Sequence, residues 1–282
     1  MTDWQWDETL YAGAAPYYQA GRVPYPAEIA DALRAELGLD GTGRLLDVGC
    51  GPGSLTVLLA PLFAAATGID GSADMIAAAR ASPAAVDWRV MRAEAISPAL
   101  GRFRTVTFAQ SFHWLDRPKV ARLVRDVLEP RGSCVLVYAM THAGVSGADP
   151  LALPRPPRDE IDGLIAAYLG TTRRAGRGIR PDRQRPGDIT MLADDAVLAS
   201  AGFFGPTCLT IGPGEVVERD EDAIVASVFS LSYAAPSLFV ERKREFERDL
   251  RALLRRASPG GRFCEELRET RLEVWRTRRS RN

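Results

Sequence analysis

The stretch Leu45-Leu46-Asp47-Val48-Gly49-Cys50-Gly51-Pro52-Gly53 decides the fold. A short, mostly apolar segment runs into a turn in which every second residue is glycine, and residues 54–63 then read as a helix. Glycines between a strand and a helix let the backbone turn sharply and approach a ligand closely at the helix N-terminus. The stretch therefore predicts a strand over residues 44–48, a ligand-binding turn and a helix over residues 54–63.

The same stretch restricts the kind of ligand. A dinucleotide-binding fingerprint, G-x-G-x-x-G, needs a third glycine where Ser54 stands, and no Gly-Lys-Ser/Thr follows for a phosphate-binding loop. Asp47 comes two residues before the first glycine, and its carboxylate would repel a pyrophosphate but attract a cation. An NAD-type oxidoreductase is therefore a disfavoured alternative, and a cationic ligand is favoured.

The pattern of strands and helices continues on both sides of this turn. Further strands are expected at residues 66–70, 86–92, 103–110 and 133–140, with helices at residues 26–37, 72–81 and 117–128. Strands separated by single helices predict an α/β fold, a doubly wound, Rossmann-like, mostly parallel seven-stranded sheet with helical lid or insertions. Later segments predict helices at residues 159–169, 191–201, 220–232 and 238–256, and strands at residues 207–211 and 271–276.

The chain is expected to divide into four parts. Residues 1–29 form an N-terminal lid segment, residues 30–140 the ligand-binding core, and residues 141–190 a lid or insertion. Residues 191–282 complete the same catalytic domain.

Composition excludes several classes of protein. Lys and Arg total 36, as do Asp and Glu, so the formal net charge is zero and a nucleic-acid binder that works by bulk charge is disfavoured. We expect no membrane span, because no apolar run is long enough, and the N-terminus has no signal-peptide pattern. Four scattered cysteines fit a cytoplasmic protein with free thiols, and no motif at metal-ligand spacing is present.

Two further segments add polar groups at strand ends. Asp70 ends the strand after the glycine-rich turn, where a carboxylate can accept both hydroxyls of a ribose. Met75 lies one helical turn after Ser72 and is suited either to cover an adenine or to pack the helix. Ala93 and Glu94 follow the third strand, where they can meet an adenine edge.

Together these segments resemble the class I S-adenosylmethionine-dependent methyltransferases. LDVGCGPG is similar to the family's first motif, GIDGSADMI to its ribose-binding motif, RAEAI to its adenine-edge motif and LEPRGSCVLV to its fifth strand. YYQAGRVPYP and SFHWLD resemble segments of small-molecule enzymes near the trans-aconitate methyltransferase group, except that Val23-Pro24 stands where Arg-Pro is commoner.

The resemblance implies S-adenosyl-L-methionine as the cofactor and assigns the residues around it. The cofactor-binding residues are then Asp47, Gly49, Gly51, Gly53, Asp70, Gly71, Met75, Ala93, Glu94, Gln110 and Arg22, with Tyr18 closing over the methionine end. No metal is implied. The expected partner is a small-molecule acceptor, without nucleic acid or membrane, and the protein is expected to be a monomer or homodimer.

The acceptor side of the site rests on His113 and on aromatic residues. His113, one of two histidines, follows the fourth strand, where an imidazole can take a proton from the acceptor. Tyr18 is the second catalytic candidate. The substrate-binding candidates are Trp4, Tyr25, Phe112 and Trp114, and Trp6 lies near them in the sequence. These rings favour an aromatic or heteroaromatic acceptor, such as an indole-like secondary metabolite.

Two alternatives to this function stay open. Arg22 and the arginines of residues 173–185 would suit a small polycarboxylate that is methylated on a carboxylate oxygen. The protein would otherwise bind S-adenosylmethionine without transferring its methyl group.

Overall fold

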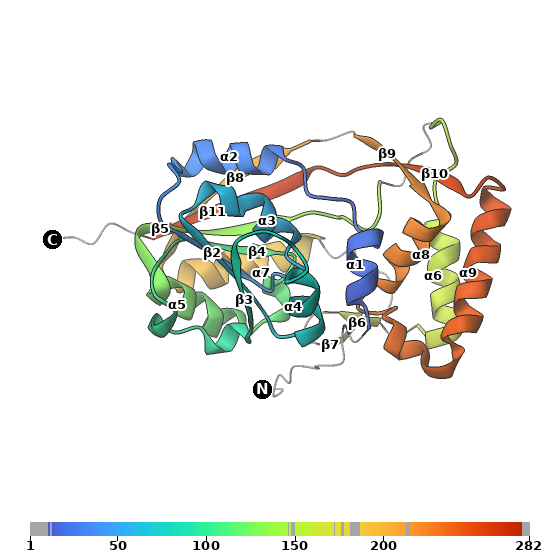
Figure 1. The fold of residues 1–282 in the computed structure, drawn as a ribbon, viewed down its shortest axis with the longest axis horizontal. Helices are drawn as coiled ribbons and strands as arrows, with labels where there is room; N and C mark the ends of the chain where they lie inside the picture. The colour runs from blue at the N-terminus through green and yellow to red at the C-terminus, as the bar shows by residue number, and fades with distance from the viewer. Residues whose placement is uncertain are drawn as a thin grey trace.

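A seven-stranded sheet forms the centre of the protein (Figure 1). The computed structural model describes residues 11, 13–145, 147, 150–171, 173–175, 178–180, 187–212 and 215–277. The strands are β1 (Arg44–Val48), β2 (Ala65–Asp70), β3 (Val86–Val90), β4 (Phe103–Ala109), β5 (Leu128–Tyr138), β8 (Phe203–Ile211) and β11 (Thr270–Thr277).

The strand order is β3-β2-β1-β4-β5-β11-β8. The first five strands pair in parallel, and β11 runs antiparallel to both β5 and β8. The structure thus confirms the predicted fold class of a mostly parallel seven-stranded sheet.

Helices cover both faces of this sheet. They are α2 (Glu28–Leu37), α3 (Ser54–Leu59), α4 (Ala73–Ala79), α5 (Arg117–Val127) and α7 (Gly187–Ser200), and a short turn, η1 (Ala60–Leu62), extends α3. Leu45 packs in one apolar cluster with α2 and α3, whereas Leu46 and Val48 pack in another with α5 and α7. Alternate residues of a strand face opposite sides, so this division follows from the sequence LLDV.

Local signals set the ends of these helices. The Ser72 side chain accepts a hydrogen bond from the Met75 backbone N–H and so caps α4, and Asp116 caps α5 through the Lys119 N–H. Gly38 ends α2 in the left-handed conformation, at φ 57°. These boundaries agree with the predicted helices.

The start of β5 differs from the prediction of a strand over 133–140. The segment Glu129-Pro130-Arg131-Gly132 reads as a turn, but β5 already begins at Leu128. Leu128 pairs with Phe103 and Ser133 with Thr105, so the register shifts there, and Arg131 has a φ of 68°. The turn-like residues therefore form an irregularity within the strand instead of a turn before it.

A second group of elements lies beside the sheet and is called the helical body below (Figure 1). It comprises α6 (Arg158–Leu169), α8 (Glu221–Phe229), η5 (Pro236–Arg242), α9 (Lys243–Ala257) and the paired strands β9 (Val216–Asp220) and β10 (Arg262–Glu266). Its own apolar core includes Ile161, Phe229, Phe239, Phe246 and Leu250. The predicted helices 159–169, 220–232 and 238–256 correspond to α6, α8 and η5 with α9, whereas β9, β10 and the short pair β6 (Arg173–Ala175) and β7 (Gly178–Arg180) were not predicted.

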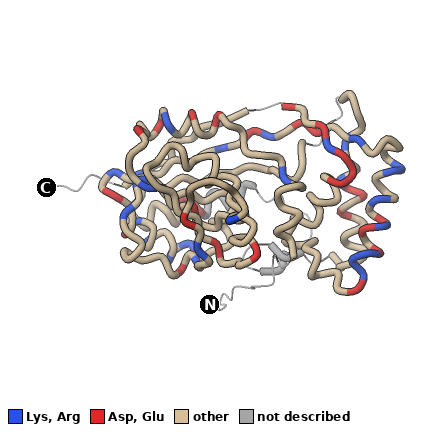
Figure 2. The backbone as a smooth tube through the Cα atoms, viewed as in Figure 1, with Lys and Arg blue, Asp and Glu red and all other residues tan. Residues whose placement is uncertain are grey.

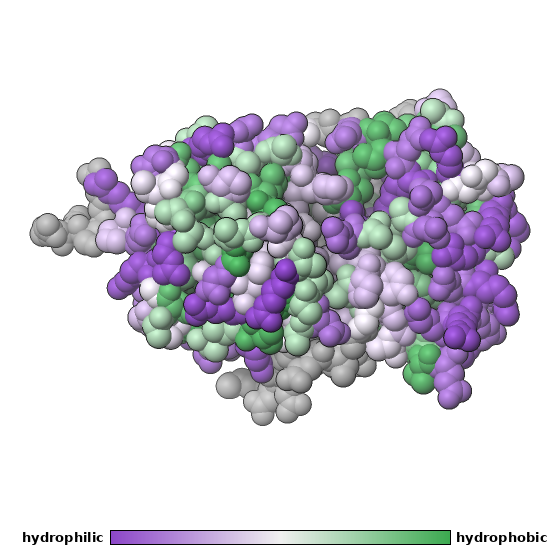
Figure 3. All heavy atoms as spheres, viewed as in Figure 1, coloured by the Kyte–Doolittle hydropathy of each residue, from purple (hydrophilic) through white to green (hydrophobic). Residues whose placement is uncertain are grey.

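The outer side of the helical body is strongly charged. Figure 2 shows basic and acidic residues in close succession along α9, and Figure 3 shows that end of the molecule as mainly hydrophilic. Arg251 pairs with Glu221, Asp222 and Glu247, and Arg255 pairs with Glu221. Within the described ranges, no helix has the length and apolar character needed to cross a membrane.

Candidate functional site

A pocket opens at the carboxyl edge of the parallel strands. Ligands of open α/β sheets bind at this edge. The loops after β1, β2, β3 and β4 form its floor and walls, and the N-terminal segment covers it. The lining residues are Tyr11, Tyr18, Gly49, Gly51, Asp70, Gly71, Met75, Met91, Arg92, Ala93, Glu94, Ala109, Gln110, Ser111, Trp114 and Leu115.

The glycine-rich loop after β1 packs too closely for side chains. Gly49 and Gly53 have φ angles of 67° and 86°, which L-residues rarely adopt. A Cβ atom on Gly49 would lie 2.5 Å from the Ser111 Cβ, and one on Gly53 would lie 2.3 Å from the Trp88 ring. Ser111 and Trp88 therefore hold the loop from either side, and its backbone is left to face the pocket.

Asp70 links the glycine-rich loop to the start of α4. Its Oδ2 accepts a hydrogen bond from the Gly51 N–H at 2.9 Å, and its Oδ1 accepts one from the Ser72 N–H at 2.8 Å. Burial raises the pKa of Asp70, while these two backbone donors lower it. A carboxylate has about four acceptor positions, so each oxygen can accept one more hydrogen bond from a ligand in the pocket.

Asp47 lies beneath the loop and does not line the pocket. It is fully buried, and its two oxygens accept hydrogen bonds from Thr56 Oγ1 at 2.5 Å and Thr107 Oγ1 at 2.8 Å. Burial raises the pKa of Asp47 to about 6. The sequence analysis predicted that Asp47 contacts the ligand. The alternation of side chains along β1 instead directs the Asp47 side chain toward α3. Its effect on the pocket is therefore limited to its charge and to its support of the glycine-rich loop.

The wall formed by the β3 and β4 loops combines apolar and polar groups. Met75 is buried and contributes an apolar surface, together with Met91. The Glu94 carboxylate accepts a hydrogen bond from the Asp116 N–H at 3.0 Å and lies 3.5 Å from Arg92 Nε. Gln110 has a positive φ of 53°, and its side chain donates to the Ala139 carbonyl at 3.0 Å. Strained residues of this kind concentrate at functional sites.

Three aromatic rings line one side of the pocket and are called the aromatic cover. The Tyr11 ring centroid lies 5.8 Å from that of Trp114 and 6.3 Å from that of Tyr18, and both pairs are edge-to-face. Burial raises the pKa of Tyr11, so its hydroxyl stays protonated at neutral pH. Tyr18 belongs to α1 (Ala15–Gly21), whereas Trp114 belongs to the turn η4 (Phe112–Trp114) after β4.

The structure brings most of the predicted cofactor residues to one pocket. Gly49, Gly51, Asp70, Gly71, Met75, Ala93, Glu94 and Gln110 line it, as do Tyr18 and Trp114. Gly53 does not line the pocket, but its missing side chain lets the loop pack against Trp88. Predicted Trp4, together with Trp6, lies outside the described residues.

Four other predicted residues lie away from the pocket lining. Phe112 is 3% exposed and packs edge-on to Phe108 in the core, because it occupies the buried side of the turn after β4. Tyr25 packs against the cluster of α2 and α3. Arg22 donates to Ser230 Oγ at 2.8 Å and lies over the Tyr18 ring at 4.5 Å. His113 is half-buried beside Trp114, with ring centroids 5.2 Å apart.

The sequence analysis missed several lining residues, namely Tyr11, Met91, Ala109, Ser111 and Leu115. Most of them lie next to motifs at the ends of the predicted strands, so extending each motif by a few residues includes them. Tyr11 had a weaker signal, because nothing local shows that it reaches Trp114 about a hundred residues later.

Comparisons with known proteins agree with this geometry. Residues 45–132 match the family model described as a methyltransferase domain. A malonyl-[acyl-carrier protein] O-methyltransferase of Enterobacter lignolyticus is 35% identical over 124 residues, 43% of this chain and 49% of that protein. An uncharacterised methyltransferase of Schizosaccharomyces pombe is 28% identical over 122 residues, 43% of this chain and 49% of that protein. The chain spans about half the length of these curated relatives.

A solved structure extends the likeness of the fold to most of the chain. A candidate type II methyltransferase from Anaeromyxobacter dehalogenans superposes with a TM-score of 0.51 at 21% identity, over 93% of this chain and 99% of that one. At this identity the likeness concerns the fold alone. Residues 45–132 thus match a methyltransferase domain, and the chain around them shares the fold of a solved methyltransferase. Methyltransferases of this fold use S-adenosylmethionine as methyl donor.

Proposed function

We propose that the protein transfers a methyl group from S-adenosylmethionine to a small-molecule acceptor that carries an aromatic or heteroaromatic ring. The observation that carries the proposal is one pocket in which Asp70, the glycine-rich loop and the aromatic cover meet. The acceptor class is the kind found among secondary metabolites, with an indole as one concrete candidate.

The residues of the pocket fit this cofactor. Asp70 keeps acceptor positions for the ribose hydroxyls, and Met75 with Met91 offers apolar surface for an adenine. The backbone of Gly49 and Gly51 faces the pocket without side chains, so a ligand can approach it closely. Asp47 and Asp70 supply negative charge on the side of the loop, which favours a cationic ligand over a pyrophosphate.

Methyl transfer depends chiefly on orientation. When bound, S-adenosylmethionine supplies a methyl group on a positively charged sulfur, ready for in-line displacement. The chain's own residues hold the reactants in line and exclude water, and good orientation can contribute on the order of 7–11 kcal/mol. The rings of Tyr11, Tyr18 and Trp114 also favour a nearby positive charge through their π-faces.

His113 is the candidate base for the acceptor proton in this proposal. It stands next to Trp114, which lines the pocket, although the imidazole itself is not part of the lining. Tyr18, the second candidate, lines the pocket directly and is suited to position the acceptor by its hydroxyl.

The pocket lining supports an aromatic acceptor over a polycarboxylate. Arg92 is the only Lys or Arg among the described lining residues, and it pairs with Glu94. A polycarboxylate needs several converging cations, whereas stacked rings gain about 0.5–1.5 kcal/mol each beyond area burial.

A carboxylate acceptor is the second candidate, and one observation favours it. Arg22 lies against Tyr18, and its partners among the described residues are hydroxyls, a carbonyl, an imidazole and a ring, with no carboxylate. Arg22 is therefore suited to pair with a carboxylate, and the relative from Enterobacter lignolyticus is an O-methyltransferase.

An acceptor panel separates the two candidates. The protein is incubated with methyl-labelled S-adenosylmethionine and with indoles, phenols or small polycarboxylates under identical conditions, and labelled products are identified by mass spectrometry. Turnover of ring-containing acceptors that falls in Trp114→Leu supports the aromatic proposal. Turnover of polycarboxylates alone, lost in Arg22→Met, would replace it. Binding of the cofactor without turnover of any acceptor would favour the binding-only alternative.

A further inference from the structure

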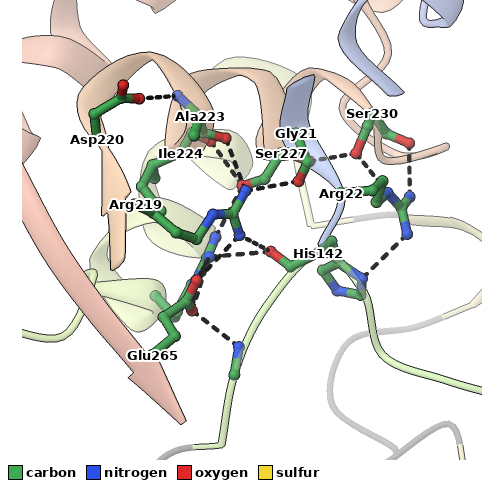
Figure 4. Close-up of polar contacts among 12 residues, drawn as sticks. Gly21, Arg22, His142, Arg219, Asp220, Ala223, Ile224, Ser227, Ser230 and Glu265 are labelled. Carbon is green, nitrogen blue, oxygen red and sulfur yellow. Dashed lines mark hydrogen bonds and ion pairs between the residues drawn. The ribbon is translucent and has the colours of Figure 1, made fainter. Parts of the chain in front are cut away.

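A buried arginine joins the N-terminal segment to the helical body. Arg219 of β9 is 7% exposed and makes four hydrogen bonds, shown in Figure 4. Its guanidinium donates to the carbonyls of Gly21 at 2.7 Å, Ala223 at 2.9 Å and His142 at 3.1 Å, and to Glu265 Oε2 at 3.1 Å. Three parts of the chain that are distant in sequence therefore meet on one side chain.

The carboxylate partner of Arg219 is itself held in place. Glu265 of β10 is 3% exposed and accepts hydrogen bonds from Arg158 at 2.8 and 2.9 Å and from the Gly144 N–H at 2.9 Å. Burying these charges costs free energy unless geometry and hydrogen bonds are good, and here every group has partners. The cluster of Arg219, Glu265 and Arg158 is called the arginine node below.

Only one member of the arginine node reaches α1. Arg158 donates hydrogen bonds to Glu265, to Ser227 Oγ at 3.2 Å and to the His142 carbonyl at 3.0 Å. It makes no hydrogen bond to the described part of the N-terminal segment. Arg219 holds the carbonyl of Gly21, the last residue of α1. The two arginines thus share a node and a carboxylate, and they differ in their contact with α1.

The end of α1 is pressed against α8. A Cβ atom on Gly21 would lie 2.3 Å from the Ala226 carbonyl carbon, so the two backbones are in direct contact there. Arg22 adds bonds to Ser230, and the Val23 N–H donates to the Thr141 carbonyl at 2.7 Å. Tyr18 lies one turn before this anchor, and Tyr11 precedes the helix.

We propose that Arg219 is a positioning residue for the methyl-transfer site, which fixes the end of α1 to the helical body and thereby holds Tyr11 and Tyr18 over the pocket. The proposal rests on the proposed function, because the pocket that is covered is the one assigned to the cofactor. The helical body then serves as the support of the aromatic cover, although it contributes no residue to the pocket lining described above.

The shape of the guanidinium explains why arginine is required here. Its N–H groups point outward in a fixed plane and reach Gly21, Ala223, His142 and Glu265 together. A lysine ammonium at the same position keeps the charge but, as a compact group, cannot span these four acceptors. Arg219→Lys therefore removes the geometric link while it leaves the charge in place.

The test measures affinity for S-adenosylhomocysteine by calorimetry in the full chain. Arg219→Lys is expected to weaken binding about 5-fold or more, which is about 1 kcal/mol or more, because the contact that fixes the end of α1 is lost. Arg158→Lys is the matched control from the same node and is expected to stay within about 2-fold of the wild type, even where both variants lose similar thermal stability.

A double-mutant cycle distinguishes positioning from a general loss of structure. In a Tyr11→Leu/Tyr18→Leu background the two tyrosine rings of the cover are absent, so Arg219→Lys is expected to change affinity less than about 2-fold. If the fold-loss of affinity caused by Arg219→Lys is the same in this background as in the wild type, Arg219 does not act through the tyrosine rings, and the proposal is overturned. Equal losses of affinity in Arg219→Lys and Arg158→Lys would also overturn it.

A second variant covers the case in which Arg219→Lys fails to fold. Gly21→Ala displaces the end of α1 from α8, and with it the carbonyl that Arg219 holds, while the Arg219 side chain itself is unchanged. It is expected to give the same affinity loss and the same cycle. Wild-type affinity in Gly21→Ala would contradict the proposal. Failure of the wild type to bind S-adenosylhomocysteine would instead refute the proposed function, so the two failures are distinguishable.

Discussion

Asp70→Asn tests the assignment of S-adenosylmethionine as the cofactor at the residue on which this assignment chiefly depends. The wild-type carboxylate accepts one backbone N–H on each oxygen, from Gly51 and Ser72. The amide of asparagine has one acceptor oxygen only, so its NH₂ must face one of these two donors. The substitution therefore disturbs the glycine-rich loop or the α4 cap and removes the charge that strengthens hydrogen bonds from the ribose.

The expected loss of affinity follows from these contacts. A hydrogen bond to a charged group contributes about 1.5–3 kcal/mol, which is about one to two decades in the dissociation constant. We expect Asp70→Asn to weaken binding of S-adenosylmethionine and S-adenosylhomocysteine alike by that amount, since both carry the ribose.

Calorimetry of the variant and of a matched control gives the answer. Asp74→Asn is the control, because Asp74 lies on the exposed side of the first turn of α4, away from the pocket lining. Affinities of Asp70→Asn and Asp74→Asn that both stay within about 2-fold of the wild type would refute the reasoning.

Three further predictions concern the base, the buried carboxylate and the loop. His113→Ala should lower kcat by ~10²–10⁴ with cofactor affinity unchanged if His113 takes the acceptor proton, and normal turnover would refute that role. The pKa of Asp47 is raised from 3.8 to about 6, so its favourable contribution to folding is complete below about pH 4 and is lost as pH rises through 6. Urea unfolding should therefore show Asp47→Asn gaining up to about 3 kcal/mol relative to the wild type between pH 4 and 7, and a pH-independent difference would contradict it. Gly53→Ala should lower the unfolding midpoint more than Gly51→Ala, because only the first places a Cβ against Trp88, and equal losses would show that the ring gives way.

Much of the sheet was predictable because its signals are local. The strand at residues 44–48, the glycine-rich turn and the helix after Asp70 each depend on signals within a few residues, and each appears where expected. The position of Asp70 in the pocket follows from its place at the end of β2, since the carboxyl ends of adjacent parallel strands meet at one edge of the sheet.

The failures depend on contacts that are distant in sequence. Pro130 and Gly132 indicate a turn, but pairing of Leu128 with Phe103 draws them into a strand. Asp47 looked like a ligand contact, yet Thr107, 60 residues away, satisfies its carboxylate in the core. The helical body was visible only as separate helices, because its link to α1 joins Arg219 with Gly21, 198 residues apart.

The central claim is that the pocket between the glycine-rich loop and the aromatic cover binds S-adenosylmethionine. Calorimetric titration of the wild-type protein with S-adenosylmethionine, and in parallel with NAD⁺, tests it most directly. The account predicts saturable binding of one S-adenosylmethionine per chain and none of NAD⁺. Binding of NAD⁺ alone, or of neither ligand, would contradict it.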